Sequence, residues 1–135
     1  MHLVWRPWVR FYDIQGRSGR TEYLVFHLLF VAVIAGLVYA AVTFDPQADG
    51  RVGPVGDKLL IAAGVFFLVA MVPLWTLAVR RLHDQDLSGW MVFLSFVPIA
   101  NIYIALTCLF SAGSDGWNSY GPDPRYPDSG LPGDA

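Results

Sequence analysis

The side chains that could do chemistry in this sequence gather in two short polar stretches. One is Arg80-Arg81-Leu82-His83-Asp84, which lies between two long apolar runs. The other precedes the first apolar run. Arginine makes two-pronged hydrogen bonds to carboxylates and phosphates, so these stretches could form ion pairs or bind a lipid headgroup or a partner. The candidate binding site comprises Arg17, Arg20, Glu22, His27, Arg80, Arg81, His83 and Asp84.

Three interpretations of this cluster remain open from the residues. Arg80 and Arg81 could simply end an apolar run and set the topology of the chain. Alternatively, Glu22 or Asp84 could pair with one of these arginines in a network that stabilises the fold. The third interpretation is a binding site for a lipid headgroup or another protein. His27 lies within an apolar run, where an ionisable group is a functional candidate, although a neutral imidazole hydrogen-bonded to a neighbouring helix is the favoured interpretation.

Catalysis is not indicated by these residues. A metal site built on His83 and Asp84 would need further ligands, and the other histidines are His2 and His27. Ser88 lacks the base and orienting group that a nucleophilic serine requires, and its position suits a helix cap. We therefore expect no enzyme activity, no catalytic residue, no metal and no cofactor.

The composition is that of a membrane protein. Hydrophobic residues make up 55% of the 135 residues and charged residues 15%, whereas soluble domains have about 45–50% and about 25%. The formal net charge of −2 argues against nucleic acid as a partner, because binding phosphates needs a basic surface. Cys108 is the single cysteine and lies in an apolar run, where it is most simply a buried apolar residue.

Three uncharged runs, 23–44, 59–79 and 90–110, are long enough to cross a membrane. As a helix the first would reach about 33 Å, against a hydrocarbon core of about 30 Å. Pro73 and Pro98 predict kinks in the second and third spans, because each proline frees a backbone carbonyl. A re-entrant hairpin is the alternative for the third run. In the first run, Ala32, Gly36 and Ala40 recur every four residues and would let another helix approach closely.

The segments outside these runs have distinct characters. In residues 1–22 an interfacial helix is expected to begin near Trp5 or Arg6. Residues 45–58 and 113–135 are rich in Gly, Pro and Asp, which predicts an exposed loop and a mobile tail. The helix would bring its aromatic and apolar residues to one face, namely Val4, Trp5, Trp8, Phe11 and Tyr12.

The expected fold is an all-α membrane protein with an N-terminal interfacial amphipathic helix followed by three transmembrane helices. Its parts are an N-terminal segment (1–22), a membrane domain (23–112) and a polar tail (113–135). Counting Lys and Arg beside the spans predicts the orientation. One side has six (Arg6, Arg10, Arg17, Arg20, Arg80 and Arg81) and the other three (Arg51, Lys58 and Arg125), which predicts a cytoplasmic N-terminus and a tail on the outside.

Several polar strings of the chain together resemble the domain-of-unknown-function 805 family of small bacterial inner-membrane proteins. They are residues 16–23 (GRSGRTEY), residues 80–84 (RRLHD), residues 88–90 (SGW), Pro98 and residues 116–124 (GWNSYGPDP). The resemblance covers about residues 11–125. It implies a polytopic inner-membrane protein without an assigned activity. The chain departs from the family pattern at residues 85–87 (QDL) and at Ser119.

The expected function is that of a non-enzymatic scaffold or accessory subunit with a charged cytoplasmic mouth. The alternatives are a small-solute or ion pathway and a lipid-headgroup binding protein. Expected partners are membrane lipids and either a larger membrane complex or further copies of the chain. We also expect His27, Pro73 and Pro98 to lie in one layer, with Thr76 and Ser95 helping to satisfy the carbonyls freed by the prolines. That layer would form a small polar pocket beneath the arginines.

Overall fold

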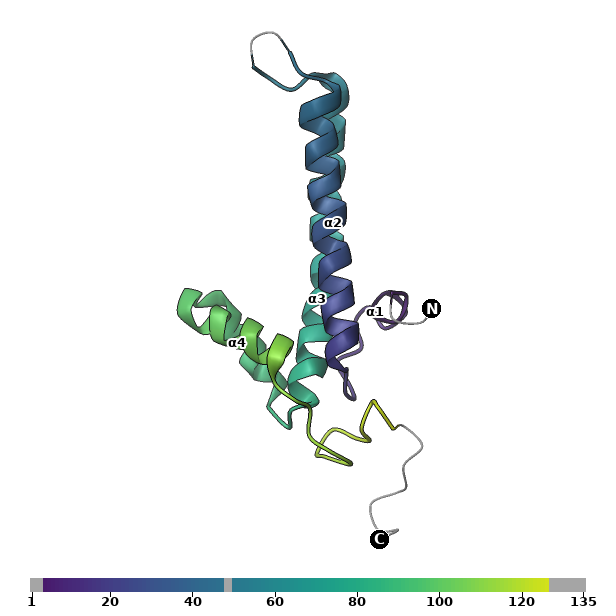
Figure 1. Cartoon of the computed structure of the whole chain (residues 1–135), viewed down its shortest axis with the longest axis vertical. Coiled ribbons are helices and arrows are strands. Elements are labelled where there is room, and N and C mark those ends of the chain that lie inside the picture. Colours follow the sequence, from purple (N-terminus) through teal and green to yellow (C-terminus); the bar gives the residue numbers. More distant parts are fainter. Residues whose placement is uncertain (1–3, 48–49, 127–135) are drawn as a thin grey trace. The chain divides into compact units, whose positions relative to one another are not determined.

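The protein is described by a computed structural model, which covers residues 4–47 and 50–126. Its elements are α1 (Arg6–Val9), α2 (Arg20–Phe44), α3 (Pro54–His83), the 3-10 helix η1 (Gly89–Phe96) and α4 (Pro98–Phe110), shown in Figure 1. The predicted all-helical class is confirmed for the described residues. The chain divides into two compact units, one of residues 27–72 and the other of the residues before and after them.

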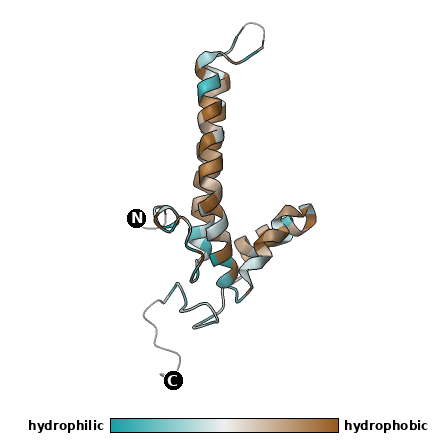
Figure 2. Ribbon diagram, turned by 180° about the vertical axis from the view of Figure 1, so that it is seen from behind, coloured by the Kyte–Doolittle hydropathy of each residue, from teal (hydrophilic) through white to brown (hydrophobic). Residues whose placement is uncertain are grey.

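Helices α2 and α3 correspond to the first two predicted spans. They have 25 and 30 residues, and both are long and apolar enough to cross a membrane. Apolar residues dominate both helices, and brown predominates along the long helical column of Figure 2. Each helix begins several residues before its uncharged run. The first turn of each helix can include an acidic residue, because its negative charge faces the positive end of the helix dipole. These residues are Glu22 in α2 and Asp57 in α3.

Within the unit of residues 27–72, aromatic contacts hold α2 against α3. The ring of Phe30 lies 6.0 Å from that of Phe66 and 5.8 Å from that of Phe67. The loop between the helices is closed by Asp45, whose Oδ2 accepts hydrogen bonds from the backbone N–H groups of Val55 (2.8 Å) and Gly56 (3.2 Å). Asp45 therefore caps α3, and the loop is shorter than the predicted 45–58.

The N-terminal segment begins its helix at Arg6, as expected, but α1 ends after one turn. The ring of Trp8 lies 5.7 Å from the ring of Phe26 and 6.3 Å from that of Phe11. Trp5 and Tyr12 are instead exposed. The prediction that these residues share one apolar face is therefore wrong. Trp8 packs against Phe26 of α2, and the helix that would align the other residues ends at Val9.

The predicted third transmembrane helix is also wrong. Its residues form two short helices, η1 and α4, which pack against each other on either side of Val97. Pro98 begins α4 rather than kinking a longer helix, and the N–H of Val97 bonds the carbonyl of Leu94 at 3.0 Å. Ser88 caps η1 as predicted, with its Oγ accepting from the N–H of Trp90. At 13 residues, α4 reaches about 20 Å, less than the hydrocarbon core of about 30 Å.

Thr76 and Ser95 do not bond the carbonyls that the prolines leave free, contrary to the prediction. Pro73 lies inside α3, and the bend expected there stays a prediction. The hydroxyl of Thr76 lies 3.2 Å from the carbonyls of Phe11 and Pro73, and Ser95 donates to the carbonyl of Val92 at 2.6 Å. Neither hydroxyl therefore bonds a carbonyl that a proline leaves free. The carbonyl of Leu94, which Pro98 leaves free, accepts from the backbone N–H of Val97.

Candidate functional site

The charged cluster forms where three segments meet: the residues before α2, the end of α3 and the chain that follows α4. All three belong to the same compact unit. The end of α3 supplies Arg80, Arg81 and His83, and Asp84 follows at once. Because α3 continues as a helix to His83, residues 80, 81 and 84 lie within about one turn of each other. The segment before α2 adds Arg17.

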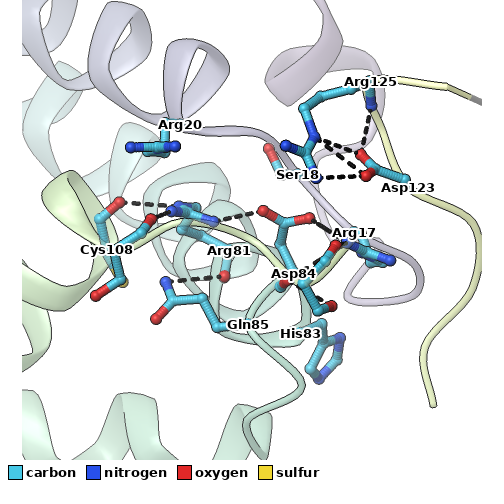
Figure 3. Close-up of polar contacts among 12 residues, drawn as sticks. Arg17, Ser18, Arg20, Arg81, His83, Asp84, Gln85, Cys108, Asp123 and Arg125 are labelled. Atoms are coloured by element: carbon cyan, nitrogen blue, oxygen red, sulfur yellow. Dashed lines mark hydrogen bonds and ion pairs between the residues drawn. The ribbon is translucent and has the colours of Figure 1, made fainter. Parts of the chain in front are cut away.

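Asp84 lies between two buried arginines. Its Oδ1 accepts from Arg17 Nε at 3.0 Å and lies 2.9 Å from Arg17 Nη2, and its Oδ2 accepts from Arg81 Nη1 at 2.5 Å. Figure 3 shows the carboxylate between the two guanidinium groups. None of the three side chains is more than 5% exposed. We call Arg17, Arg81 and Asp84 the clamp; of the ion pairs left open by the sequence, the one between Asp84 and Arg81 is formed.

Arg81 also holds the C-terminal end of α4. Its Nε donates to the carbonyl of Cys108 at 2.9 Å and its Nη2 to that of Ser111. Gln85 donates in the same way to the carbonyl of Thr107 at 3.2 Å. The last carbonyls of a helix lack partners within the helix and carry its negative dipole, so a buried cation is favourable here. Arg81 thus caps α4 while it pairs with Asp84.

Arg17 holds the chain that follows α4. It donates to the carbonyls of Ser114 (2.5 Å), Gly116 (2.5 Å) and Gly121 (3.2 Å). The backbone N–H of Ser114 in turn bonds the carbonyl of Asp84 at 2.7 Å. Residues 113–126 are therefore held in place, and the predicted mobile tail is wrong for them. Residues 127–135 lie outside the described residues.

His83 fixes the same segment through its ring. The imidazole stacks on Tyr120, with centroids 3.8 Å apart and planes within 5°. Its Nδ1 lies 3.3 Å from the carbonyl of Gly16, and its own backbone carbonyl accepts from Asn118 Nδ2 at 2.8 Å. These tail residues were not anticipated as part of the site. The signal that could have found them is the turn-forming string 116–124, because a specific turn implies a fixed position.

Arg80 has a different environment from Arg81. Its guanidinium is completely buried, yet Nε, Nη1 and Nη2 have no hydrogen-bond partner among the described residues. Glu22 is close enough to act on it electrostatically, and Oε1 of Glu22 likewise has no partner within that part of the chain. The other oxygen of Glu22 accepts from Ser18 Oγ at 2.8 Å. The possible pairing of Glu22 with Arg80 is therefore not formed as a direct contact.

Two predicted members lie outside this arrangement. Arg20 is exposed, and it donates a 3.3 Å hydrogen bond to the carbonyl of Phe110 at the end of α4. His27 belongs to the unit of residues 27–72, so its place in the cluster, and the pocket with Pro73 and Pro98, stay predictions.

A second charged group lies at the end of the described tail. Arg125 bonds both oxygens of Asp123, at 2.9 and 2.5 Å, and its Nη2 also bonds Asp115 at 2.6 Å. These hydrogen bonds lower the pKa of Asp123 to about 2 and raise the pKa of Arg125. The backbone N–H of Gln15 similarly lowers the pKa of Asp13. Together these pairs fix the surface turns around the clamp.

The arrangement binds the chain to itself. Both arginines of the clamp direct their N–H groups at a carboxylate and at backbone carbonyls of the same protein. Among the described residues, no three His, Cys, Asp or Glu side chains come together in a way that could hold a metal ion. The clamp therefore has the chemistry of a buried ion-pair network that joins segments far apart in the chain.

Comparison with known proteins assigns the sequence to a family. Residues 11–122 match the family model described as "Protein of unknown function (DUF805)". The chain is 32% identical to inner membrane protein YhaI of Escherichia coli K12 over 111 residues, which covers 82% of this chain and 85% of the relative. It is 30% identical to inner membrane protein YhaH of the same strain over 113 residues, which covers 82% and 86%. No solved structure matches. The chain belongs to the DUF805 family of proteins of unknown function.

Proposed function

We propose that this protein is a non-enzymatic scaffold or accessory subunit of the bacterial inner membrane. The observation that carries the proposal is the clamp, whose two arginines and one aspartate join three segments of the chain to one another. A rigid platform of this kind suits a protein that presents a surface to others. The location is supported by the relatives, which are named inner membrane proteins, and by two helices of spanning length.

The proposed orientation puts the N-terminus in the cytoplasm. With α2 and α3 as the spans, Arg125 joins the six cations of the N-terminal side, because the described tail is bound to the clamp. Only Arg51 and Lys58 then remain on the other side, which makes the count seven against two. This larger excess supports a cytoplasmic N-terminus by the positive-inside rule.

Polar side chains within the two long helices support a scaffold rather than a solute pathway. The charged and buried residues gather at one end of α3 and in the segment before α2. In the outer part of α2, from Val33 to Phe44, the polar side chains are Tyr39 and Thr43, and the hydroxyl of Thr43 bonds the carbonyl of Tyr39. A pathway would need polar groups along its whole length.

The surface offered to a partner is proposed to be the small-residue face of α2. Ala32 and Gly36 are exposed, and a side-chain carbon added at Gly36 would meet nothing within 4 Å. A photo-crosslinking residue at Gly36, in native membranes, should give a discrete heavier adduct containing a second protein or a second copy. Val38, which is also exposed, lies about 200° around the helix from Gly36 and is the control. Lipid adducts alone at both positions would contradict this use of the face.

Binding of a phospholipid headgroup is the second candidate function, and Arg80 is the observation that favours it. Its buried nitrogens, which have no hydrogen-bond partner among the described residues, match the two-pronged recognition of a phosphate. Arg6 and Arg10 add positive charge to its surroundings, while Asp13 and Glu22 add negative charge. Exposed Trp5 and Tyr12 on the same segment suit the headgroup layer of a membrane.

The headgroup reading predicts that phosphatidylglycerol, added to the protein in detergent, raises the melting temperature of the wild type and of Arg20→Gln. It should not raise that of Arg80→Gln. Arg20 is the matched control, because it is an exposed arginine of the same unit. An equal rise in all three proteins would mean that the lipid acts through general charge, and this candidate would be rejected.

A further inference from the structure

Residues 89–110 form a hairpin whose two ends are both fixed at the end of α3. At the start of the hairpin, a side-chain carbon added to Gly89 would lie 2.8 Å from Nε2 of His83 and 2.7 Å from Cγ1 of Val79. At its end, Arg81 bonds the carbonyl of Cys108. The chain therefore leaves the end of α3 and returns to it, and its turn at Val97 lies away from the clamp.

The turn of the hairpin lies beside an earlier part of α3. The ring of Phe96 contacts that of Trp75 edge-on, with centroids 5.3 Å apart. Trp75 precedes His83 by eight residues, which corresponds to about 12 Å along a helix. Since α3 is a span and its charged residues here are at the His83 end, the turn reaches about 12 Å from that end toward the apolar part of α3.

The hairpin exposes an apolar surface, and contact of this surface with water would be unfavourable. No charged residue occurs between Leu87 and Ser114. Ile99, directly after the turn, is 84% exposed. Burial of each such side chain away from water is favourable, so several together need an apolar cover. The exposed large residues are Trp90, Phe93, Leu94, Phe96, Val97, Ile99, Ile102, Tyr103, Leu106 and Phe110.

The backbone of the turn is compatible with a lipid environment. Hydrocarbon cannot satisfy free N–H or carbonyl groups, so an irregular turn in a membrane must bond to itself or to protein. Here the N–H of Val97 bonds the carbonyl of Leu94, and the N–H of Asn101 bonds the carbonyl of Val97 at 2.7 Å. The hydroxyl of Ser95 is satisfied by the carbonyl of Val92. These N–H groups and this hydroxyl are thus bonded within the chain, as a lipid environment requires of them.

We propose that residues 89–110 are a re-entrant hairpin embedded in one leaflet of the membrane, covered by the acyl chains of that leaflet. Lipid is the occupant because the hairpin surface continues from the side of α3, a span, and because α4 is too short to reach the opposite face. The described parts of both chain ends, which meet at the clamp, then lie on the same side of the membrane. This inference is independent of the proposed scaffold role.

Sidedness is tested with single cysteines in a Cys108→Ala background, which keeps the backbone carbonyl that Arg81 uses. Gln15→Cys, Gln47→Cys and Tyr126→Cys are labelled with an impermeant thiol reagent from one side of sealed membranes and then from the other. We expect Gln15 and Tyr126 to react from one side and Gln47 from the opposite side. Reaction of Tyr126 from the side of Gln47 would establish a third span and overturn the proposal.

The lipid cover is tested at the turn with Ile99→Cys carrying an environment-sensitive fluorophore. The protein is purified and reconstituted alone in vesicles of phosphatidylethanolamine and phosphatidylglycerol. We expect blue-shifted emission, quenched more strongly by a mid-chain spin-labelled lipid than by a headgroup-labelled one. Emission typical of water, or stronger quenching by the headgroup label, would overturn the proposal, since the turn would then lie outside the leaflet. A fluorophore at Gln15, expected to be water-exposed, is the control.

Discussion

Arg80 and Arg81 are adjacent, and both side chains are completely buried, yet only Arg81 has hydrogen-bond partners among the described residues. Successive residues of a helix point about 100° apart, so the two arginines meet different segments. Arg81 meets Asp84 and the end of α4. Arg80 lies toward Glu22 and the N-terminal segment. The pair therefore combines a structural role, that of Arg81, and the binding role proposed for Arg80 in two consecutive residues.

This difference predicts opposite effects of the same substitution. Arg81→Met should lower the free energy of unfolding by about 3–5 kcal/mol, because it leaves the buried carboxylate of Asp84 with one cation fewer and the end of α4 uncapped. Arg80→Met should leave stability unchanged or raise it, because it removes a buried charge that has no hydrogen-bond partner in the described part of the chain. Both variants are compared with the wild type by thermal melting in one detergent. Equal losses would show that Arg80 is as firmly bonded as Arg81.

Glycine substitutions test how tightly the tail packs on the clamp. A side-chain carbon added at Gly113 would overlap the carboxylate of Asp84, whereas one added at Gly19 would meet nothing within 4 Å. Gly113→Ala should therefore destabilise the protein by about 1–3 kcal/mol, the usual cost of overpacking. Gly19→Ala should have little effect. Melting curves of the two variants, together with protease sensitivity of the tail, would decide the point; an intact tail in Gly113→Ala would contradict the observed packing.

Tyr120 is expected to act through its ring rather than its hydroxyl. Tyr120→Phe keeps the stack on His83 and should melt like the wild type. Tyr120→Ala removes the stack and should cost about 0.5–1.5 kcal/mol in addition to the lost apolar burial. Faster proteolysis of the tail in the alanine variant would accompany that loss. If the two variants behave alike, the stack contributes nothing to holding the tail.

Asp123 predicts a loss of stability in acid. Its pKa is about 2 in the folded protein against an ordinary 3.8, so the folded state favours the ionised form. The stabilisation is present above about pH 4 and is lost as the pH falls through 2. Wild type and Asp123→Asn should therefore differ in melting temperature at pH 5 and converge near pH 2. A difference that does not change with pH would rule out the ion pair with Arg125 as its cause.

The two spans could be predicted from sequence because a long uncharged run has few structural alternatives. Their ends could not be placed as well, since capping by Asp45 depends on a loop that folds back. The pairing of Arg81 with Asp84 was within reach, as the two are three residues apart. Arg17 was not assignable to Asp84, because 67 residues separate them, and most of its other acceptors are backbone carbonyls that leave no mark in the sequence. Pro98 was ambiguous, because a proline can kink a helix or begin one.

Asp84 couples the segment before α2 to the end of α3, and a double-mutant cycle between Arg17 and Asp84 measures this coupling. The wild type, Arg17→Gln, Asp84→Asn and the double variant are melted in the same detergent. We predict that the double variant is hardly less stable than Asp84→Asn alone, with a coupling energy of about 1–3 kcal/mol. Losses that simply add, with no coupling, would contradict the account.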